Sequence, residues 1–197
     1  MSYENNIIFI TGTPCVGKTT ISSKLVDDLS NNFITKLIKI NDLAIKNDLI
    51  LGEDPDKGYK IVDVKSLNNK LKETIDTFFN ISSSKDKSKL VIVEGHLSHL
   101  CEPCDKCIVL RLNPSVLKTR LESRDYSYSK VNENLEAEAL SVCSAEAVNI
   151  HGDKVNEIDT TNKSIDDVIN IVKEVILNDM YCPVGSVDFM QWILDNL

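Results

Sequence analysis

Residues 12 to 19 read Gly12-Thr13-Pro14-Cys15-Val16-Gly17-Lys18-Thr19. Two glycines that flank four residues and are followed by Lys and then Ser or Thr are the pattern of a phosphate-binding loop. In such a loop successive backbone N–H groups hold phosphate oxygens, and glycine lets the backbone come close to them. The spacing predicts that Lys18 faces the β- and γ-phosphates of a bound nucleotide and that the Thr19 hydroxyl binds Mg²⁺.

The segments on the two sides of this loop support the interpretation. Residues 7 to 11, Ile-Ile-Phe-Ile-Thr, form an apolar run typical of a strand buried on both faces. Beyond the loop, Ile21, Leu25 and Leu29 recur at helical spacing and predict a helix that begins at Lys18. A glycine turn beside an ordinary surface lysine is the alternative, and the flanking strand and helix favour the phosphate loop.

The rest of the chain alternates apolar runs with helical patterns. Asn113 before Pro114, and Ser164 before two aspartates, are signals for the start of a helix. Strands that alternate with helices predict an α/β fold of the P-loop NTPase class, a parallel five-stranded sheet flanked by helices. The remaining strands are predicted over residues 36–40, 90–93, 107–110 and 155–158, and the helices over about 67–78, 114–124, 133–148 and 165–177. Residues 41–60 form a polar region with little core-forming pattern, and residues 125–134 are predicted as a polar loop.

The chain has 197 residues, of which 42% are hydrophobic and 26% are charged, and this suits one compact domain. We expect that domain to span residues 1–180. The tail, residues 181–197, carries Phe189, Trp192 and Leu194. Because this is more apolar surface than a free tail would expose, we expect the tail to dock on the domain.

Acidic residues outnumber basic ones by 30 to 22, which gives a net charge of −8. This balance argues against a dominant surface for direct nucleic-acid binding and favours a basic protein as a partner. No apolar run approaches the about 20 residues of a membrane-spanning helix. The first residues also lack the basic start of a signal peptide. We therefore expect a soluble, cytoplasmic protein with no membrane partner.

The six cysteines have two further interpretations. Three disulfides would suit a secreted chain, but without a signal peptide reduced thiols are favoured. Cys101, Cys104 and Cys107, with His99, have the spacing of part of a zinc site. Because Cys107 falls at the start of a predicted strand, we favour ordinary loop and core cysteines and expect no structural zinc.

A second group of polar residues follows the predicted strand 90–93. Glu94 stands at the carboxyl end of this strand, where ligands bind in open α/β sheets. There it can hold Mg²⁺ through water or orient an attacking group. His96 can position water or accept a proton, and an uninvolved histidine in a polar loop is the alternative.

The three arginines form a third group. Only Arg111, Arg120 and Arg124 are arginine among the 22 basic residues. A planar guanidinium binds phosphate in bidentate fashion and stabilises the charge that develops in phosphoryl transfer. Arg124, at the start of a polar interruption, is predicted to meet phosphoryl charge. For Arg111 and Arg120 both a phosphate role and a purely structural or solvated role stay open.

Together these residues resemble one branch of the adenylate kinase superfamily, the archaeal members and their eukaryotic nuclear relatives, over about residues 7 to 177. The resemblance is carried by residues 11–20, by Asn41-Asp42-Leu43-Ala44, by Val91-Ile92-Val93-Glu94-Gly95-His96, by Val109-Leu110-Arg111, by residues 120–126, and by Asn134 and Glu138.

The resemblance implies a monophosphate-binding lobe over about residues 39–62 and a lid over about 123–133. It implies that Asn41 and Asp42 contact the monophosphate. Together with the motifs above it assigns the catalytic roles to Lys18, Glu94, His96 and Arg124, the ATP contacts to Gly12, Cys15, Gly17, Lys18, Thr19, Thr20 and Arg124, and the Mg²⁺ contacts to Thr19 and, directly or through water, to Glu94.

Four residues depart from the family pattern. Cys15 stands where the family usually has glycine, so the loop must tolerate a Cβ there. Ile45 occupies a position where many relatives carry an arginine beside the monophosphate. Glu94 replaces the usual Asp, and Asp125 replaces a glycine of the lid.

The function that these observations predict is reversible transfer of the ATP γ-phosphoryl group to AMP, with Mg²⁺ as cofactor and two ADP as products. The resemblance also implies a part in maturation of the small ribosomal subunit. One alternative is therefore an ATPase assembly factor that binds a basic small-subunit ribosomal protein. Another is a P-loop kinase for a different small metabolite, such as dephospho-coenzyme A or shikimate.

Overall fold

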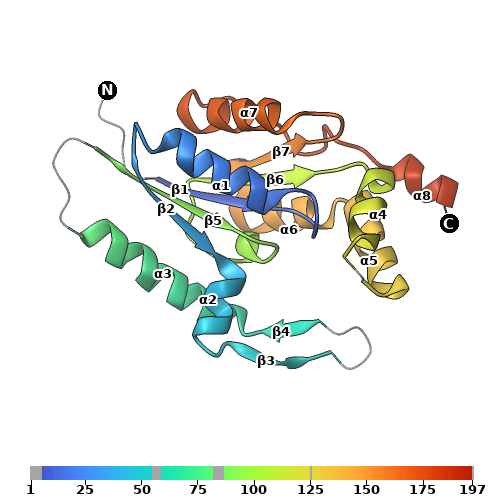
Figure 1. The fold of residues 1–197 in the computed structure, drawn as a ribbon, viewed down its shortest axis with the longest axis horizontal. Coiled ribbons are helices and arrows are strands. Elements are labelled where there is room, and N and C mark those ends of the chain that lie inside the picture. The colour runs from blue at the N-terminus through green and yellow to red at the C-terminus, as the bar shows by residue number, and fades with distance from the viewer. Residues whose placement is uncertain (1–5, 55–58, 82–86, 125, 197) are drawn as a thin grey trace.

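In the part of the chain that the computed structural model describes, residues 6–54, 59–81, 87–124 and 126–196, five parallel strands form the centre of the molecule (Figure 1). They lie in the order β2-β5-β1-β6-β7. The prediction of a parallel five-stranded α/β sheet is confirmed. The strands are β1 Asn6–Thr11, β2 Ile34–Lys39, β5 Lys89–Glu94, β6 Lys106–Arg111 and β7 Val155–Asp159.

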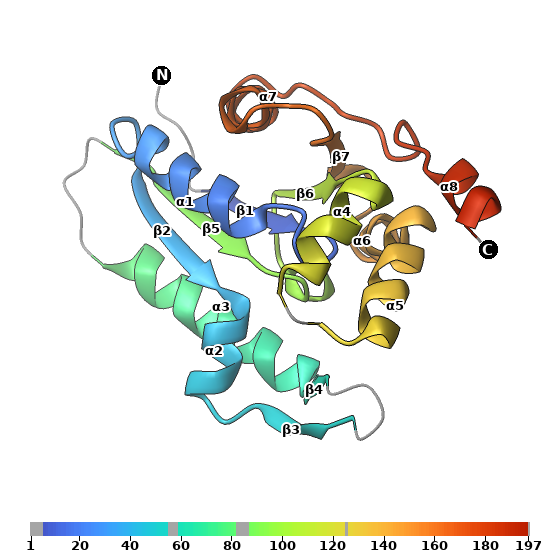
Figure 2. The same cartoon turned by 45° about the vertical axis from the view of Figure 1, so that its right-hand side comes forward.

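Helices cover both faces of this sheet. Helices α1 (Lys18–Leu29) and α7 (Ile165–Leu177) lie on one face, and α3 (Val64–Asn80) and α6 (Val142–His151) lie on the other (Figures 1 and 2). Successive side chains of a strand point to opposite faces, so β1 contributes Ile8 and Ile10 to one apolar cluster and Ile7 and Phe9 to the second. The three central strands, β5, β1 and β6, are mostly apolar because helices cover both of their faces, whereas the edge strand β2 carries Lys36 and Lys39 and is only partly buried.

The predicted signals for the start of a helix are confirmed at two places. Helix α4 (Pro114–Glu122) begins after Asn113, whose side chain accepts a hydrogen bond from the Ser115 N–H at 2.9 Å. Helix α7 begins after Ser164, which forms a reciprocal capping box with Asp167.

The prediction of a loop over residues 125–134, followed by a single helix over 133–148, is wrong. Helix α5 (Tyr128–Ala139) already begins after Ser127, whose side chain accepts from the Lys130 N–H. Its inward positions Val131, Asn134 and Leu135 are buried, a helical spacing that surrounding polar residues obscure in the sequence. The chain then breaks at Ser141, which has a φ of 58°, before α6 starts.

The polar region 41–60, which shows little core-forming pattern in the sequence, holds secondary structure of its own. Helix α2 (Ile40–Lys46) follows β2 directly, and a hairpin of β3 (Ile50–Glu53) and β4 (Lys60–Val62) comes next. Figure 2 shows α2 and this hairpin projecting from the sheet below α3. In the part of the chain that the structure describes there are also two short 3₁₀ helices, Ser98–Leu100 after β5 and Gly152–Lys154 before β7.

The C-terminal tail runs back along β7 and ends in helix α8 (Met190–Asn196), beside α4 and α5 (Figures 1 and 2). The Glu157 N–H donates to the Cys182 carbonyl at 2.9 Å, and the Trp192 indole N–H donates to the Ser115 hydroxyl at 3.1 Å. All six cysteines are free thiols. No helix within the described ranges is long and apolar enough to span a bilayer.

Gly95 provides a test of how closely the turn after β5 packs against helix α2. It has a φ of +145°, and an added Cβ would lie 2.3 Å from the Cγ2 atom of Ile40 at the start of α2. We expect Gly95→Ala to lower the free energy of unfolding by roughly 2 kcal/mol, from backbone strain and steric overlap. Gly52→Ala is the matched control, since a Cβ there meets no atom within 4 Å. Equal urea midpoints for the two variants would contradict this packing.

Candidate active site

Strands β1 and β5 end side by side, and the candidate site lies at these ends. Their register pairs Ile10 with Glu94, and the Gly95 N–H donates to the Ile10 carbonyl at 3.1 Å. The chain leaves β1 at Thr11 and enters the phosphate-loop sequence immediately afterwards. The pairing therefore places the Glu94 carboxylate next to the start of that loop.

The loop backbone turns through left-handed conformations. Gly12, Cys15 and Gly17 have φ values of 130°, 71° and 113°. A Cβ on Gly12 would lie 2.4 Å from the Leu110 carbonyl oxygen, so only glycine fits there. Cys15 carries a Cβ in a conformation that costs an L-residue roughly 1–2 kcal/mol. Its carbonyl accepts a hydrogen bond from the Arg120 guanidinium at 3.3 Å, which supports the strained residue.

Lys18, the first residue of α1, folds back over the loop. Its ammonium donates to the carbonyls of Gly12 and Thr13, both at 2.8 Å. Burial lowers the pKa of Lys18, and the nearby carboxylate of Glu94 acts in the opposite direction. The ammonium is thus held by neutral carbonyl groups at the point where the loop can receive an anion.

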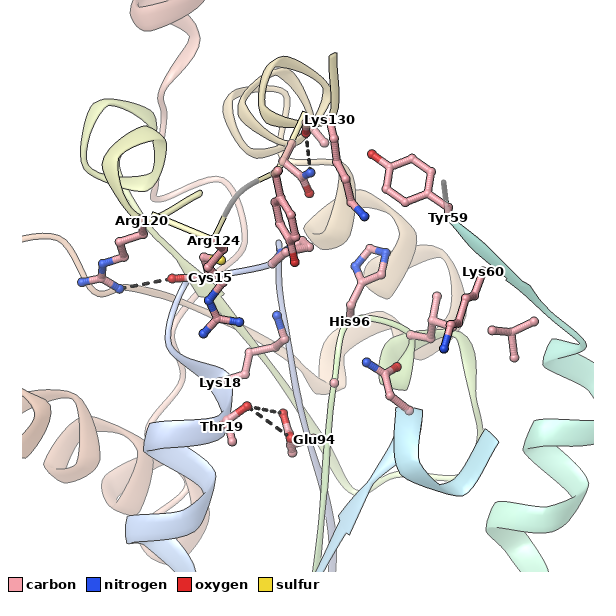
Figure 3. A pocket seen from close by; sticks show the side chains of 18 of the residues that line it. Cys15, Lys18, Thr19, Tyr59, Lys60, Glu94, His96, Arg120, Arg124 and Lys130 are labelled. Atoms are coloured by element: carbon pink, nitrogen blue, oxygen red, sulfur yellow. Dashed lines mark hydrogen bonds between the residues drawn. The ribbon is translucent and has the colours of Figure 1, made fainter. Parts of the chain in front are cut away.

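Thr19 and Glu94 face each other across the loop (Figure 3). The Thr19 hydroxyl lies 3.3 and 3.4 Å from the two carboxylate oxygens of Glu94. Burial raises the pKa of Glu94, while the charge of Lys18 and the hydrogen bond from Thr19 lower it. A hydroxyl and a carboxylate oxygen are the hard ligands that Mg²⁺ prefers, so these two side chains fit the predicted metal contacts.

His96 stands between the loop and the β3–β4 hairpin (Figure 3). The ring is accessible to solvent from the open side, although protein surrounds it on the others. Desolvation by these walls, together with the positive charge of Lys18, lowers the pKa of His96 to about 4. The imidazole is therefore neutral at pH 7 and able to accept a hydrogen bond or a proton.

A second histidine, which the sequence interpretation considered only as a metal ligand, lies behind the site. The His99 ring is buried, with Nδ1 2.6 Å from the Thr11 hydroxyl and Nε2 2.9 Å from the Glu146 carboxylate. Desolvation lowers the pKa of His99, and Glu146 opposes this effect. Within the described ranges no three His, Cys, Asp or Glu side chains are grouped as a metal site requires.

The three arginines have different surroundings. Arg120 and Arg124 are exposed and line the cleft above the loop (Figure 3). Arg111 is fully buried and pairs with Glu138 at 2.9 Å and with Glu157. A phosphate role for Arg111 is therefore wrong, because two carboxylates already enclose its guanidinium away from the cleft.

A single cleft of about 940 Å³ connects the phosphate loop with the 39–62 region and helix α5. Asn41 and Ile45 of α2 line it, whereas Asp42 is exposed and is absent from its lining. Gly12 also lies outside the lining, and Asp125 falls outside the described residues. Among the predicted residues the cleft is lined by Cys15, Gly17, Lys18, Thr19, Thr20, Asn41, Glu94, His96 and Arg124.

The sequence interpretation missed the residues that join the hairpin to α5 across this cleft. The Tyr59 hydroxyl donates to Glu133 at 2.9 Å, and burial is the main cause that raises the pKa of Tyr59 to about 12. The Lys130 ammonium lies 4.7 Å from the centre of the Tyr59 ring and 4.6 Å from that of Tyr126. An ammonium group is attracted to the face of an aromatic ring. These contacts therefore hold the hairpin side of the cleft against α5. Local sequence carries no signal for them.

Known proteins share both sequence and fold with this chain. A family profile described as an AAA domain matches residues 8–141. A protein of Methanothermobacter thermautotrophicus named "Putative adenylate kinase" is 43% identical over 188 residues, which cover 95% of this chain and 99% of that protein. One of the same name from Methanocaldococcus jannaschii is 44% identical over 169 residues, covering 86% and 83%. The chain belongs to this adenylate kinase family.

Solved structures with low sequence identity confirm the fold of this adenylate kinase family member. A thymidylate kinase from Candida albicans superposes with a TM-score of 0.59 at 15% identity, covering 91% of this chain and 94% of that one. A shikimate kinase from Bacteroides thetaiotaomicron gives 0.53 at 14% identity, covering 87% and 98%. Fold and family together make the chain a nucleotide-binding P-loop kinase.

The three histidines, of which His99 and His151 are buried, predict a dependence of stability on pH. Desolvation lowers the pKa of His96, His99 and His151 below their ordinary values. Below about pH 6.5 the unfolded chain therefore binds protons that the native state does not, and stability falls as the pH falls. We expect a smaller free energy of unfolding in urea at pH 5 than at pH 7.5.

His99→Gln tests this assignment, because an amide does not titrate in this range. The difference in unfolding free energy between the two pH values should shrink in this variant. The exposed substitution Asn149→Gln should keep the wild-type difference. A pH difference in His99→Gln as large as that of the wild type would contradict the prediction.

Proposed function

We propose that the protein is a nucleoside monophosphate kinase of adenylate kinase type, which catalyses ATP + AMP = 2 ADP. The observation that carries this proposal is the continuous cleft between the phosphate loop and the 39–62 lobe. Phosphoryl transfer between two nucleotides needs a site for each, close enough for an in-line displacement. The names of the archaeal relatives support AMP as the acceptor.

On the ATP side, the loop residues Gly12 to Thr20 would hold the phosphates through backbone N–H groups and Lys18. Lys18 would exchange its carbonyl partners, Gly12 and Thr13, for phosphate oxygens. Arg124, exposed on the cleft wall, would meet the charge on the transferring group. Thr19 and Glu94 would hold Mg²⁺, which neutralises phosphate charge when it is bound.

On the monophosphate side, Asn41 and the cleft-lining face of α2 would contact AMP, whereas Asp42 lies outside the cleft lining. Ile45 lies on the cleft wall with 51% of its surface exposed, an apolar side chain where many relatives carry arginine. Recognition of the AMP phosphate in this protein would therefore depend on other polar groups of the cleft. His96, neutral at pH 7, would donate its ring N–H to an oxygen of the attacking AMP phosphate between the two nucleotides.

Lys18→Ala tests the phosphate loop. Removal of the buried ammonium should reduce ADP formation from ATP and AMP by roughly 100-fold or more. The reason is that the variant lacks the preorganised positive charge that stabilises the negative charge of the transferring phosphoryl group. The control is Lys24→Ala, on the same helix, where the ammonium pairs with Asp166 at the surface. A coupled assay for ADP measures both. Wild-type turnover in Lys18→Ala would refute the assignment.

A second candidate function is ATP hydrolysis in an assembly factor that binds a basic small-subunit ribosomal protein. The observation that favours it is the neutral His96 near Glu94 in the cleft, an arrangement that can orient an attacking water molecule. The net charge of −8 suits a basic partner.

The two functions differ in their response to nucleoside monophosphates. For the kinase we expect ATP turnover to rise strongly with AMP, with ADP as product and little free phosphate. For the ATPase, phosphate release would be indifferent to AMP. Turnover is measured with each monophosphate in turn, with Lys18→Ala as the blank. Phosphate release at an equal rate with and without AMP would overturn the kinase proposal.

A further inference from the structure

Thr13 connects the phosphate loop to the protein interior. Its carbonyl accepts from the Lys18 ammonium at 2.8 Å, and its hydroxyl donates to the buried Glu138 carboxylate of α5. Both Thr13 and Glu138 are almost fully buried, at 2% and 1% exposure. The residue that holds Lys18 is thus itself held by a carboxylate outside the cleft.

Glu138 is one end of a buried group of three charges. Its Oε1 atom accepts from the Arg111 Nε and the Leu112 N–H, each at 2.9 Å. Arg111 also donates to the Glu138 carbonyl at 2.6 Å and to Glu157 of β7. One guanidinium therefore joins two carboxylates, and the group carries one excess negative charge in the core.

The tail supplies the donors that complete this group. Among the described residues, the Oε2 atom of Glu157 accepts from the backbone N–H groups of Gly185 and Val187, at 2.9 and 3.3 Å. The Phe189 ring lies 5.3 Å from the Arg111 guanidinium carbon. Without residues 185–189, a buried carboxylate oxygen loses these partners and a buried guanidinium loses its cover.

A buried carboxylate that loses hydrogen bonds is destabilised, because its charge stays desolvated without a partner. Either water enters to replace the lost donors, or the side chain moves. Either response shifts Arg111 and then Glu138, since the guanidinium is shared between Glu157 and Glu138. The Thr13 hydroxyl is bonded to Glu138, so a shift of Glu138 also moves Thr13. Thr13 lies in the phosphate loop, where residues 12, 15 and 17 have left-handed backbone conformations. Such backbone conformations persist only where their surroundings hold them.

We propose that residues 185–189 of the tail position the phosphate loop for ATP, through Glu157, Arg111, Glu138 and Thr13. Residues 185, 187 and 189 are absent from the lining of the cleft, so they act as positioning residues. The inference rests on the proposed ATP site at the phosphate loop. It predicts that the tail affects the ATP side of the reaction more than the monophosphate side.

The test compares two shortened chains with the full chain. Deletion of residues 185–197 removes the donors, whereas deletion of residues 192–197 removes most of α8 and keeps the donors and Phe189. We expect the first deletion to raise the Kd of ATP by about 10-fold and to leave the KM of AMP within about 2-fold. The second should leave both constants near wild type. Calorimetry gives the Kd, and the ADP assay gives the KM.

Phe189→Ala decides the question if the longer deletion does not fold, since it removes the cover of Arg111 from an intact chain. It should raise the Kd of ATP in the same direction. Thr13→Val, which lacks the hydroxyl, should weaken ATP binding, and Thr13→Ser should restore it. The longer deletion should then have little further effect in the Thr13→Val background.

A merely structural tail would lower the melting temperature but leave ATP binding unchanged in the folded protein. Unchanged ATP affinity in the folded 185–197 deletion, or in Phe189→Ala, would overturn the inference. Equal losses toward ATP and AMP would also overturn it. A wild-type chain that does not bind ATP would refute the proposed function instead, so the two failures are distinguishable.

Discussion

The site depends on the register between β1 and β5. Pairing of Ile10 with Glu94, extended by the hydrogen bond from Gly95 to Ile10, brings the end of one strand to the start of the phosphate loop. A slip by one residue would turn every side chain of the strand to the opposite layer and move Glu94 away from Thr19. Residues of different size fill the two apolar clusters, Ile8 and Ile10 on one side and Ile7 and Phe9 on the other, so the close packing of the core opposes such a slip. The core of the sheet therefore fixes the position of Glu94.

The buried charges around Arg111 are a second constraint, and they act on the same loop from behind. A guanidinium enclosed by two carboxylates is stable only when the remaining hydrogen-bond positions are satisfied. Here α5, β7 and the tail all converge to satisfy them. These elements are distant in the sequence, and their meeting point is Arg111, whose partner Glu138 is one hydrogen bond from Thr13. The packing of the tail and the position of the loop are therefore linked.

The sheet, α1 and the phosphate loop could be predicted because their signals are local: apolar runs, helical spacing and a motif. The first turn of helix α5 and the break between α5 and α6 could not, since Tyr128 to Lys130 are polar and the buried face of α5 becomes evident only against the core. Arg111 was open to a phosphate role because an arginine after an apolar strand looks the same whether it meets phosphate or carboxylates. Contacts such as Tyr59 with Glu133 depend on how two distant segments are brought together.

The central claim is that one cleft binds two nucleotides at once, with the phosphate loop at one end and the α2 lobe at the other. The most direct measurement is calorimetric titration with two adenosines joined by five phosphates, a molecule that spans both sites. It should bind one to one and at least roughly 100-fold more tightly than ATP or AMP alone, since the second contact becomes intramolecular. Binding no tighter than that of ATP would contradict the claim.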